Sequence, residues 1–353
     1  MGYLILESGL VLPGEFRGGK PRAGEVVFNT SHSGYEEMAT DPSYFSQILV
    51  ATAPQQGNYG VDDQAWESKN IWINGFVCVE IQCSKRDSSW LHRLTDAGVP
   101  VLTDVDTRRL TLHLRENGTT WGAICDASSL AAANAQAEQL IKAAKEQPSD
   151  WTQLVCRKQP ENIKGLRPTG PKVAVLDFGA KENILRELKQ RCREIRVFPS
   201  QTRASEIMEW APDGIMLTNG PGDPAEVHAG RETVRQLLGH KFIFGICMGH
   251  QVLALALGAT TYKLKFGHRG SNHPIRDQLL NRVYVTSQNH GYNVAPESLP
   301  AGVQVTHINL NDNTVAGIYH PELKCLSVQF HPESHPGPHD AVALFDYFID
   351  RIV

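Results

Sequence analysis

The stretch Gly-Ile-Cys-Met-Gly at residues 245–249 decides the fold class of this chain and much of its chemistry. An apolar run at 242–244 precedes it and favours a buried strand, and residues 251–257 follow with the composition of a helix. Glycines on both sides of Cys247 permit a sharp strand-to-helix elbow, which projects the central side chain outward from a strained backbone. The thiol would then lie at a helix N-terminus, where the helix dipole favours the thiolate. The stretch therefore predicts a cysteine nucleophile.

The composition limits what kind of protein carries this cysteine. The chain has 353 residues, which is enough for two domains with separate cores. A net charge of −4 gives no basic signal for nucleic acid or for a membrane surface, and no apolar run is long enough to cross a bilayer. The seven cysteines are scattered without a Cys-x-x-Cys pair, and the first residues do not resemble a secretory signal. We expect reduced thiols, a cytoplasmic location, and no nucleic-acid or membrane partner.

The pattern along the chain predicts an α/β protein of two parts. Residues 1–150 contain short β-like runs and predict a separate β-rich α/β N-terminal domain, and the polar, Pro- and Gly-containing span 151–171 predicts a linker. Residues 172–353 begin with alternating strands and helices, which predicts a mostly parallel, doubly wound sheet that carries the elbow. Functional groups of such sheets gather beyond the carboxyl ends of the strands, where the loops 177–179 and 219–224 also fall.

A thiolate nucleophile needs a base, and the base needs an orienting group. His331, Pro332 and Glu333 follow a strand-like run, and the proline favours an extended backbone in which the flanking side chains share one side. Glu333 would then accept from one ring nitrogen of His331 while the other nitrogen faces Cys247. A lone cysteine is usually a small core residue, and a lone His-Pro-Glu is usually a turn. Their combination with the glycine elbow favours catalysis.

An acyl transfer also needs hydrogen-bond donors for the tetrahedral oxyanion. The backbone N–H of Met248, directly after the nucleophile, is one candidate. The loop 219–224 supplies the other from Gly220 or Gly222, because Pro221 has no N–H. Taken alone, its Gly-Pro-Gly sequence would be interpreted as a plain turn.

Three motifs together give the chain a family resemblance. Residues 219–224, 245–251 and 331–333, which follow one another in the order expected of the family, resemble the class I triad-type glutamine amidotransferases over residues 172–353. The resemblance then narrows to the small chains of carbamoyl-phosphate synthetase. It does so at 265–274, 287–292 and 336–340, and in the N-terminal half at 24–31, 34–35 and 40–44. Other triad amidotransferases lack that N-terminal domain, so the resemblance covers the whole chain.

The resemblance implies a catalytic triad of Cys247, His331 and Glu333. It also implies contacts to L-glutamine and its oxyanion from Ser43, Gly220, Gly222, Met248, Gln251, Asn289, Gly291 and Tyr292. Gly220 and Met248 would supply the oxyanion amides, and Ser43 would reach the substrate from the N-terminal domain. Met248 and Tyr292 stand where Leu and Phe are common in the family, and both keep the required shape.

The resemblance further implies a glutaminase subunit that forms a cysteinyl thioester and passes ammonia to a large chain. That partner would use ATP, Mg²⁺ and bicarbonate to make carbamoyl phosphate, as a heterodimer or a higher assembly, and this chain would need no cofactor or metal. Two alternatives remain open, a stand-alone γ-glutamyl hydrolase and a non-catalytic scaffold on the same fold. Whether the product serves pyrimidine synthesis, arginine synthesis or both is left open too.

Two further patterns are rejected as sites. Residues 14–21 nearly form a phosphate-binding loop, but they end in proline where a Mg²⁺-binding hydroxyl is required, so we expect a turn without an ATP site. His331, His335 and His339 recur at helical spacing, but the intervening prolines exclude a regular helix, so we expect no zinc site.

Overall fold

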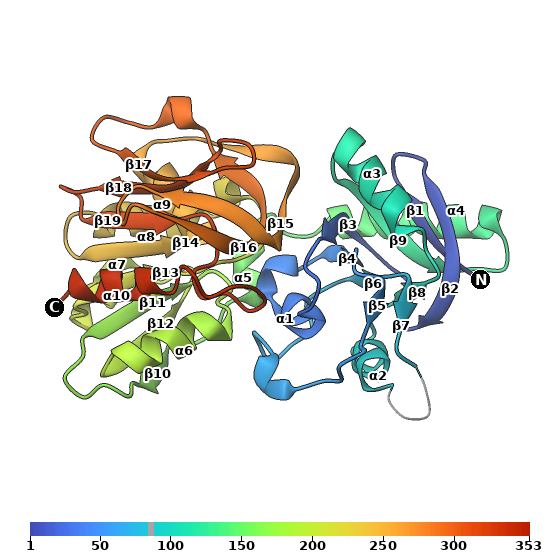
Figure 1. The fold of residues 1–353 in the computed structure, drawn as a ribbon, viewed down its shortest axis with the longest axis horizontal. Helices are drawn as coiled ribbons and strands as arrows, with labels where there is room; N and C mark the ends of the chain where they lie inside the picture. Colours follow the sequence, from blue (N-terminus) through green and yellow to red (C-terminus); the bar gives the residue numbers. More distant parts are fainter. Residues whose placement is uncertain (84–87) are drawn as a thin grey trace. The chain divides into compact units, whose positions relative to one another are not determined.

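The computed structural model describes residues 1–83 and 88–353 and divides the chain into two compact units, Met1–Pro148 and Ser149–Val353 (Figure 1). Each unit has buried hydrophobic clusters of its own.

Unit 1 is built on a closed barrel with the strand order β1-β2-β8-β6-β4-β3-β9. Its strands are β1 (Gly2–Leu6), β2 (Val11–Gly18), β3 (Arg22–Asn29), β4 (Gln47–Ala51), β6 (Gly75–Val77), β8 (Val101–Thr103) and β9 (Thr120–Asp126). A small separate pair is formed by β5 (Gln55–Gln56) and β7 (Glu80–Ile81). The helices are α1 (Tyr35–Thr40), α2 (Ser89–Asp96), α3 (Thr107–Asn117) and α4 (Leu130–Lys145). Alanines of α4 pack on the outer face of β1, β3 and β9, which small side chains such as Ala23 and Ala123 leave flat.

The near phosphate-binding sequence in unit 1 is not the turn that we expected. Most of it forms β2, which pairs with β1 and β8. A Cβ at Gly14 would lie 2.6 Å from the carbonyl oxygen of Thr103, so this glycine allows two strands to approach. The expectation failed because glycines spaced for a loop also suit a closely packed strand.

Unit 2 contains a ten-stranded sheet of order β10-β12-β11-β13-β14-β19-β18-β17-β15-β16. Its parallel part comprises β12 (Glu194–Pro199), β11 (Lys172–Asp177), β13 (Gly214–Leu217), β14 (Phe242–Ile246) and β19 (Cys325–Val328). Antiparallel strands flank it, namely β10 (Glu161–Lys164) on one side and β18 (Val315–His320), β17 (Gln304–Asn309), β15 (Thr261–Asp277) and β16 (Arg282–Val294) on the other.

Helices cover both faces of the parallel strands, as alternation along β11 shows. Val173 and Val175 join one buried cluster with α6 (Glu182–Arg191) and α10 (Ala343–Asp350). Ala174 and Leu176 join the other, with α7 (Ala204–Glu209), α8 (His228–Leu237) and α9 (Met248–Leu257). Successive side chains of a strand point to opposite faces, so a strand apolar on both faces must be covered twice. The predicted doubly wound α/β fold is confirmed.

Part of the span predicted as a linker, 151–171, belongs to the structure of unit 2. It contains α5 (Thr152–Val155) and β10, which pairs antiparallel with β12. Polar residues suit β10 because an edge strand has one solvated side, and that polarity makes such a strand hard to distinguish from a linker in the sequence.

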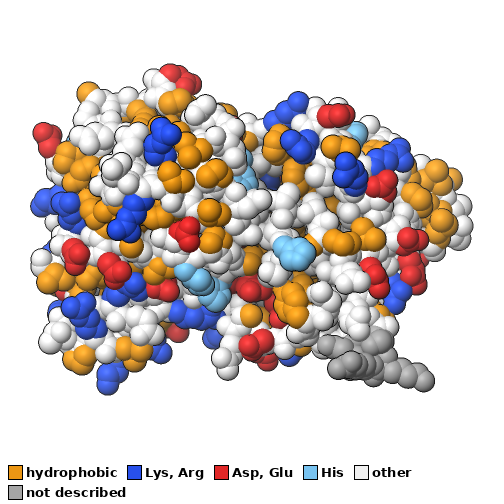
Figure 2. Space-filling view, viewed as in Figure 1, with side chains coloured by type: hydrophobic (Ala, Val, Ile, Leu, Met, Phe, Trp, Pro, Cys, Tyr) orange, Lys and Arg blue, Asp and Glu red, His pale blue; other side chains and the backbone are white. Residues whose placement is uncertain are grey.

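The surface carries both signs of charge. Figure 2 shows Lys and Arg interspersed with Asp and Glu over the visible face of the described residues, in keeping with the net charge of −4. Within residues 1–83 and 88–353, no helix combines the length and the apolar character needed to cross a membrane.

Candidate active site

The elbow after β14 places Cys247 in a conformation that L-residues rarely adopt. Its backbone torsions are φ 53° and ψ −102°, and α9 begins at the next residue. A non-glycine residue held in such a region costs of the order of 1–3 kcal/mol, which the surrounding packing must offset. A Cβ at Gly245 would lie 2.8 Å from the backbone of Gly249, and one at Gly249 would lie 2.5 Å from Leu217 O. The two glycines therefore let β14, α9 and β13 meet around the cysteine, and the predicted strand-to-helix elbow is confirmed.

His331 and Glu333 form a hydrogen-bonded pair just beyond β19. His331 Nδ1 lies 2.6 Å from Glu333 Oε1, and both side chains are buried. The backbone N–H of His331 donates to Ser287 O at 3.0 Å, which ties the histidine to β16. Because Nδ1 faces the carboxylate, Nε2 is the ring nitrogen that is available to exchange a proton with Cys247.

The charges in this cluster stabilise an imidazolium. Burial acts to lower the pKa of His331, but the Glu333 carboxylate and the Cys247 side chain outweigh it and raise the pKa to about 10. Among the described residues, Nε2 of His331 has no hydrogen-bond partner that meets normal distance and angle limits. Cys247 is nevertheless one of the groups that raise the pKa of His331, and catalytic hydrogen bonds are often long before substrate binds.

Lys181 is a buried cation that the sequence analysis did not identify. Its Nζ lies 3.2 Å from Glu333 Oε1 and also donates to Ser334 O, and both charged side chains are at most 3% exposed. Burial acts to raise the pKa of Glu333, but Lys181, followed by His331, outweighs it and lowers the pKa to about 2. Glu333 is therefore held ionised between a lysine and the histidine that it orients.

The loop that carries Lys181 is fixed by the end of β11 and by the neighbouring strand. Asp177 Oδ1 accepts from the N–H groups of Gly179 and Ala180, and Asn219 Oδ1 accepts from Lys181 N at 3.0 Å. The sequence did single out residues 177–179 as a loop at a strand end. A lysine two positions later was the available signal, but its carboxylate partner is remote in sequence.

The predicted oxyanion donors lie around the same strand ends. Cys247 N donates to Val328 O and Gly249 N donates to Thr218 O. The amide between them, that of Met248, is the first of α9, and first-turn N–H groups have no acceptor within their own helix. A Cβ at Gly220 would lie 2.3 Å from Phe178 O, and Gly222 has φ 90°, so this loop requires both glycines.

The predicted glutamine contacts of unit 2 are joined to the elbow by hydrogen bonds. Cys247 Sγ lies 3.6 Å from Asn289 O, and Gln251 Nε2 donates to Tyr292 O at 2.8 Å and to Gln329 Oε1 at 3.1 Å. Gly291 lies between Asn289 and Tyr292 on β16. The structure thus gathers the unit 2 candidates into one region beyond the parallel strands.

Ser43 belongs to unit 1. It lies in a 3₁₀ turn, Pro42–Tyr44, where its N–H donates to Asp41 Oδ1 at 2.9 Å. Its contact with glutamine stays a prediction.

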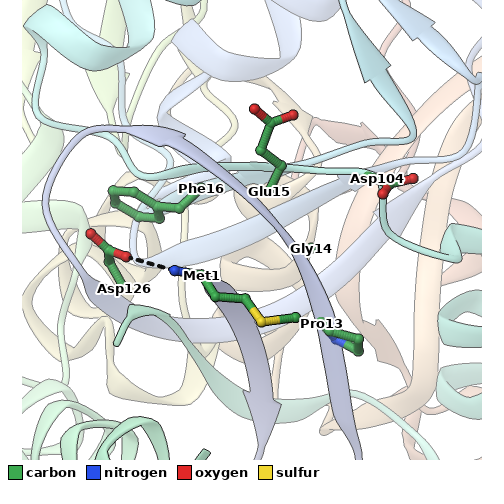
Figure 3. A pocket seen from close by; sticks show the side chains of 7 residues that line it. All are labelled: Met1, Pro13, Gly14, Glu15, Phe16, Asp104 and Asp126. Carbon is green, nitrogen blue, oxygen red and sulfur yellow. Dashed lines mark hydrogen bonds and ion pairs between the residues drawn. The ribbon is translucent and has the colours of Figure 1, made fainter. Parts of the chain in front are cut away.

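A hollow of about 470 Å³ in unit 1 is not part of this site (Figure 3). It is lined by Met1, Pro13, Gly14, Glu15, Phe16, Asp104 and Asp126. Its polar side chains are carboxylates, one of which pairs with the amino group of Met1, so it offers no nucleophile and base for acyl transfer.

Both parts of the chain match families of known proteins. Residues 174–351 match the family Glutamine amidotransferase class-I, and residues 4–124 match the family Carbamoyl-phosphate synthase small chain, CPSase domain. The chain belongs to the carbamoyl-phosphate synthase small-chain family. The carbamoyl phosphate synthase small chain of Symbiobacterium thermophilum is 47% identical over 98% of this chain and 96% of its own length.

Two further relatives extend the small-chain comparison. The carbamoyl phosphate synthase small chain of Bacillus caldolyticus is 45% identical over 99% of this chain and 96% of its own length. A relative from Halalkalibacterium halodurans, described as a pyrimidine-specific small chain, is 43% identical over 98% of this chain and 95% of its own length. The family resemblance stated from the motifs is confirmed.

Proposed function

We propose that this chain hydrolyses L-glutamine and delivers the ammonia to the large chain of a carbamoyl-phosphate synthase. The observation that carries the proposal is Cys247, held at positive φ on a helix N-terminus beside the buried His331–Glu333 pair. A nucleophile, a base and an orienting carboxylate in this arrangement suit acyl transfer.

The first half-reaction forms a thioester. The Cys247 thiolate attacks the γ-carboxamide carbon, and the N–H groups of Met248 and Gly220 stabilise the oxyanion. The C–N bond then breaks while His331 gives its Nε2 proton to the departing nitrogen, so ammonia leaves and the γ-glutamyl group stays on sulfur. Glu333 keeps the ring oriented and stabilises its charge, and Lys181 keeps Glu333 ionised.

The second half-reaction releases glutamate. Neutral His331 takes a proton from water, the resulting hydroxide attacks the thioester carbonyl, and the C–S bond breaks to return the thiolate. Gln251, Asn289, Gly291, Tyr292, Gly222 and Ser43 would bind the substrate, whose α-carboxylate and α-ammonium groups need polar partners. No metal or cofactor on this chain enters either step.

The large chain would consume ammonia together with ATP, Mg²⁺ and bicarbonate. The relatives are named small chains, which implies a larger partner in a heterodimer or higher assembly, and we place the complex in the cytoplasm. Its carbamoyl phosphate would serve pyrimidine synthesis, arginine synthesis or both. A stand-alone γ-glutamyl hydrolase is less well supported, because the N-terminal small-chain domain is present. A non-catalytic scaffold is less well supported because Cys247, His331 and Glu333 are together.

The test is Cys247→Ser in the complex reconstituted with the large chain. We expect glutamine-dependent carbamoyl phosphate synthesis to fall at least about a thousandfold, since removal of a nucleophile removes the covalent route. Synthesis from added ammonia should stay within about twofold of the wild type. Wild-type glutamine-dependent synthesis in the variant would refute the assignment of the nucleophile.

A further inference from the structure

A hydrogen-bonded line of side chains in unit 2 runs from the protein surface to the predicted glutamine contacts. It begins at Asp312, on the turn between β17 and β18, and continues through His268 on β15 and His290 on β16. None of these residues is part of the proposed triad or of the proposed glutamine contacts, yet two of them are buried polar groups. Polar networks in a buried setting stabilise one arrangement when each group is satisfied.

Asp312 fixes the orientation of His268. Its Oδ2 lies 2.7 Å from His268 Nε2, while its Oδ1 accepts from the N–H and the hydroxyl of Thr314 at 3.1 and 2.8 Å. Burial acts to raise the pKa of Asp312, but its hydrogen bonds to His268 and Thr314 outweigh this and lower the pKa to about 2. The ionised carboxylate therefore accepts from His268 Nε2, and the opposite nitrogen, Nδ1, points to His290 at 3.3 Å.

His290 passes this orientation to the part of β16 that carries Asn289, Gly291 and Tyr292. His268 and His290 face each other across the β15–β16 pair, and their rings meet edge to face with centroids 4.9 Å apart. Burial and the nearby His268 keep the pKa of His290 well below its ordinary value, so the ring is neutral. His290 Nδ1 lies 2.8 Å from Tyr292 O. The other ring nitrogen, Nε2, lies 3.3 Å from His268 Nδ1 and 3.0 Å from Gln288 Oε1, so contacts at both nitrogens fix the orientation of the ring.

Tyr292 O is the point where this line meets the elbow helix. The same carbonyl accepts from Gln251 Nε2 at 2.8 Å, and Gln251 also bonds to Gln329, two residues before His331. The carbonyl therefore lies between His290 Nδ1 and the Gln251 amide that donates to it. A rotated His290 ring would lose its contacts with His268 and Tyr292 O and would disturb the part of β16 between Asn289 and Tyr292.

We propose that Asp312 and His268 are positioning residues for glutamine binding, which they support by holding the His290 ring in place beside Tyr292 O. The inference rests on the proposed function of the site. It predicts that interruption of the line far from Cys247 weakens glutamine binding more than it slows the chemical step, because the triad is held by other contacts, from Lys181 and Ser287.

The experiment measures KM and kcat for glutamine in the complex with the large chain. Asp312→Asn should raise KM about fivefold to thirtyfold, the ratio that corresponds to the loss of about 1–2 kcal/mol, and should change kcat less than about threefold. The matched control is Asp346→Asn, which removes another partly exposed carboxylate, paired with Arg191 on the α6–α10 side, and should leave KM unchanged. An unchanged KM in Asp312→Asn would overturn the inference.

A double-mutant cycle separates positioning through His290 from a general structural role. If Asp312 acts through His290, Asp312→Asn should change KM less than about twofold in a His290→Asn background. An equal effect in both backgrounds would overturn the inference. If Asp312→Asn does not fold, His268→Asn replaces it. This substitution interrupts the line at the residue between Asp312 and His290, and the same changes in KM and kcat are expected of it.

A binding measurement distinguishes failure of this inference from failure of the proposed function. Calorimetric titration of glutamine into Cys247→Ser and into Cys247→Ser/Asp312→Asn should show a weaker dissociation constant in the double variant, by the same factor as KM. Equal constants, together with normal wild-type glutamine turnover, would overturn only the role of Asp312. A wild-type complex that neither binds nor hydrolyses glutamine would overturn both proposals.

Discussion

The two ends of the parallel sheet in unit 2 each carry a buried cysteine, in neighbouring parallel strands. Cys325 begins β19, at the amino end of the sheet, and Cys247 directly follows β14, at the carboxyl end. They are 1% and 2% exposed, so burial does not distinguish them. Burial raises the pKa of the Cys325 thiol to about 12 and leaves it inert. Cys247 instead has a helix N-terminus, His331 and the Lys181–Glu333 pair beside it.

Position in the sheet, rather than burial, distinguishes the candidate nucleophile Cys247 from the core residue Cys325. At the carboxyl end, the loops after β11, β13, β14 and β19 converge, so residues far apart in sequence supply a base, a carboxylate and a lysine. At the amino end, Cys325 belongs to the apolar cluster under α7, α8 and α9. The same side chain is therefore a core residue at one end and a candidate nucleophile at the other.

The largest effect is expected when each of the two cysteines, at opposite ends of the parallel strands, is replaced by serine. Cys325→Ser should retain glutamine-dependent synthesis within about threefold, since its thiol contacts no reacting group, whereas Cys247→Ser should lose it. The measurement is steady-state turnover with glutamine at equal concentrations of folded complex. A comparable loss in both variants would mean that cysteine position does not decide reactivity in this sheet.

The buried lysine gives the next largest effect. Lys181→Met removes the cation beside Glu333, and an uncompensated buried charge costs about 3–5 kcal/mol of the free energy of unfolding. The glutamine-dependent kcat should also fall at least about tenfold, because Glu333 no longer holds His331 charged. Urea denaturation and steady-state kinetics measure the two effects. Lys189→Met, at an exposed position of α6, is the control and should change neither.

The charge state of His331 predicts a pH dependence of stability. The pKa of a histidine is about 6.5 in an unfolded chain, and His331 has a pKa of about 10 in the folded one. A raised folded-state pKa contributes stability that is complete below pH 6.5 and is lost as the pH rises toward 10. The difference in unfolding free energy between wild type and His331→Asn should therefore shrink over this interval. A difference that stays constant or grows with pH would show that His331 is not held charged.

The smallest effect tests backbone strain at the elbow. Cys247→Gly should be more stable than Cys247→Ala by about 1 kcal/mol, because glycine adopts a positive φ without a Cβ clash. At Cys325, inside a strand, the order should reverse by about 0.5–1 kcal/mol. Chemical denaturation of the four variants measures both differences. If the glycine variant were more stable than the alanine variant at both positions, or less stable at both, the backbone at Cys247 would not be strained as we infer.

The sequence predicted those parts of the candidate site that lie within short contiguous motifs. The elbow, the His331-Pro332-Glu333 motif and the loop 219–224 are contiguous, and the α/β alternation placed them at the same end of a parallel sheet. Lys181 was missed because its carboxylate partner follows β19 and lies near it only once the sheet has formed. The line from Asp312 to His290 was missed for a similar reason, since it depends on the register of β15 and β16, and β15 itself was not predicted. Tertiary pairing, rather than local propensity, fixes such contacts.

The most direct test of the central claim is to trap the acyl-enzyme. The complex is mixed with glutamine, quenched in acid during turnover, digested, and analysed by mass spectrometry for a γ-glutamyl adduct. The account predicts the adduct on the peptide that contains Cys247 and its absence from the peptide that contains Cys325. An adduct on another residue, or turnover without any adduct on Cys247 in single-turnover quenching, would contradict the account.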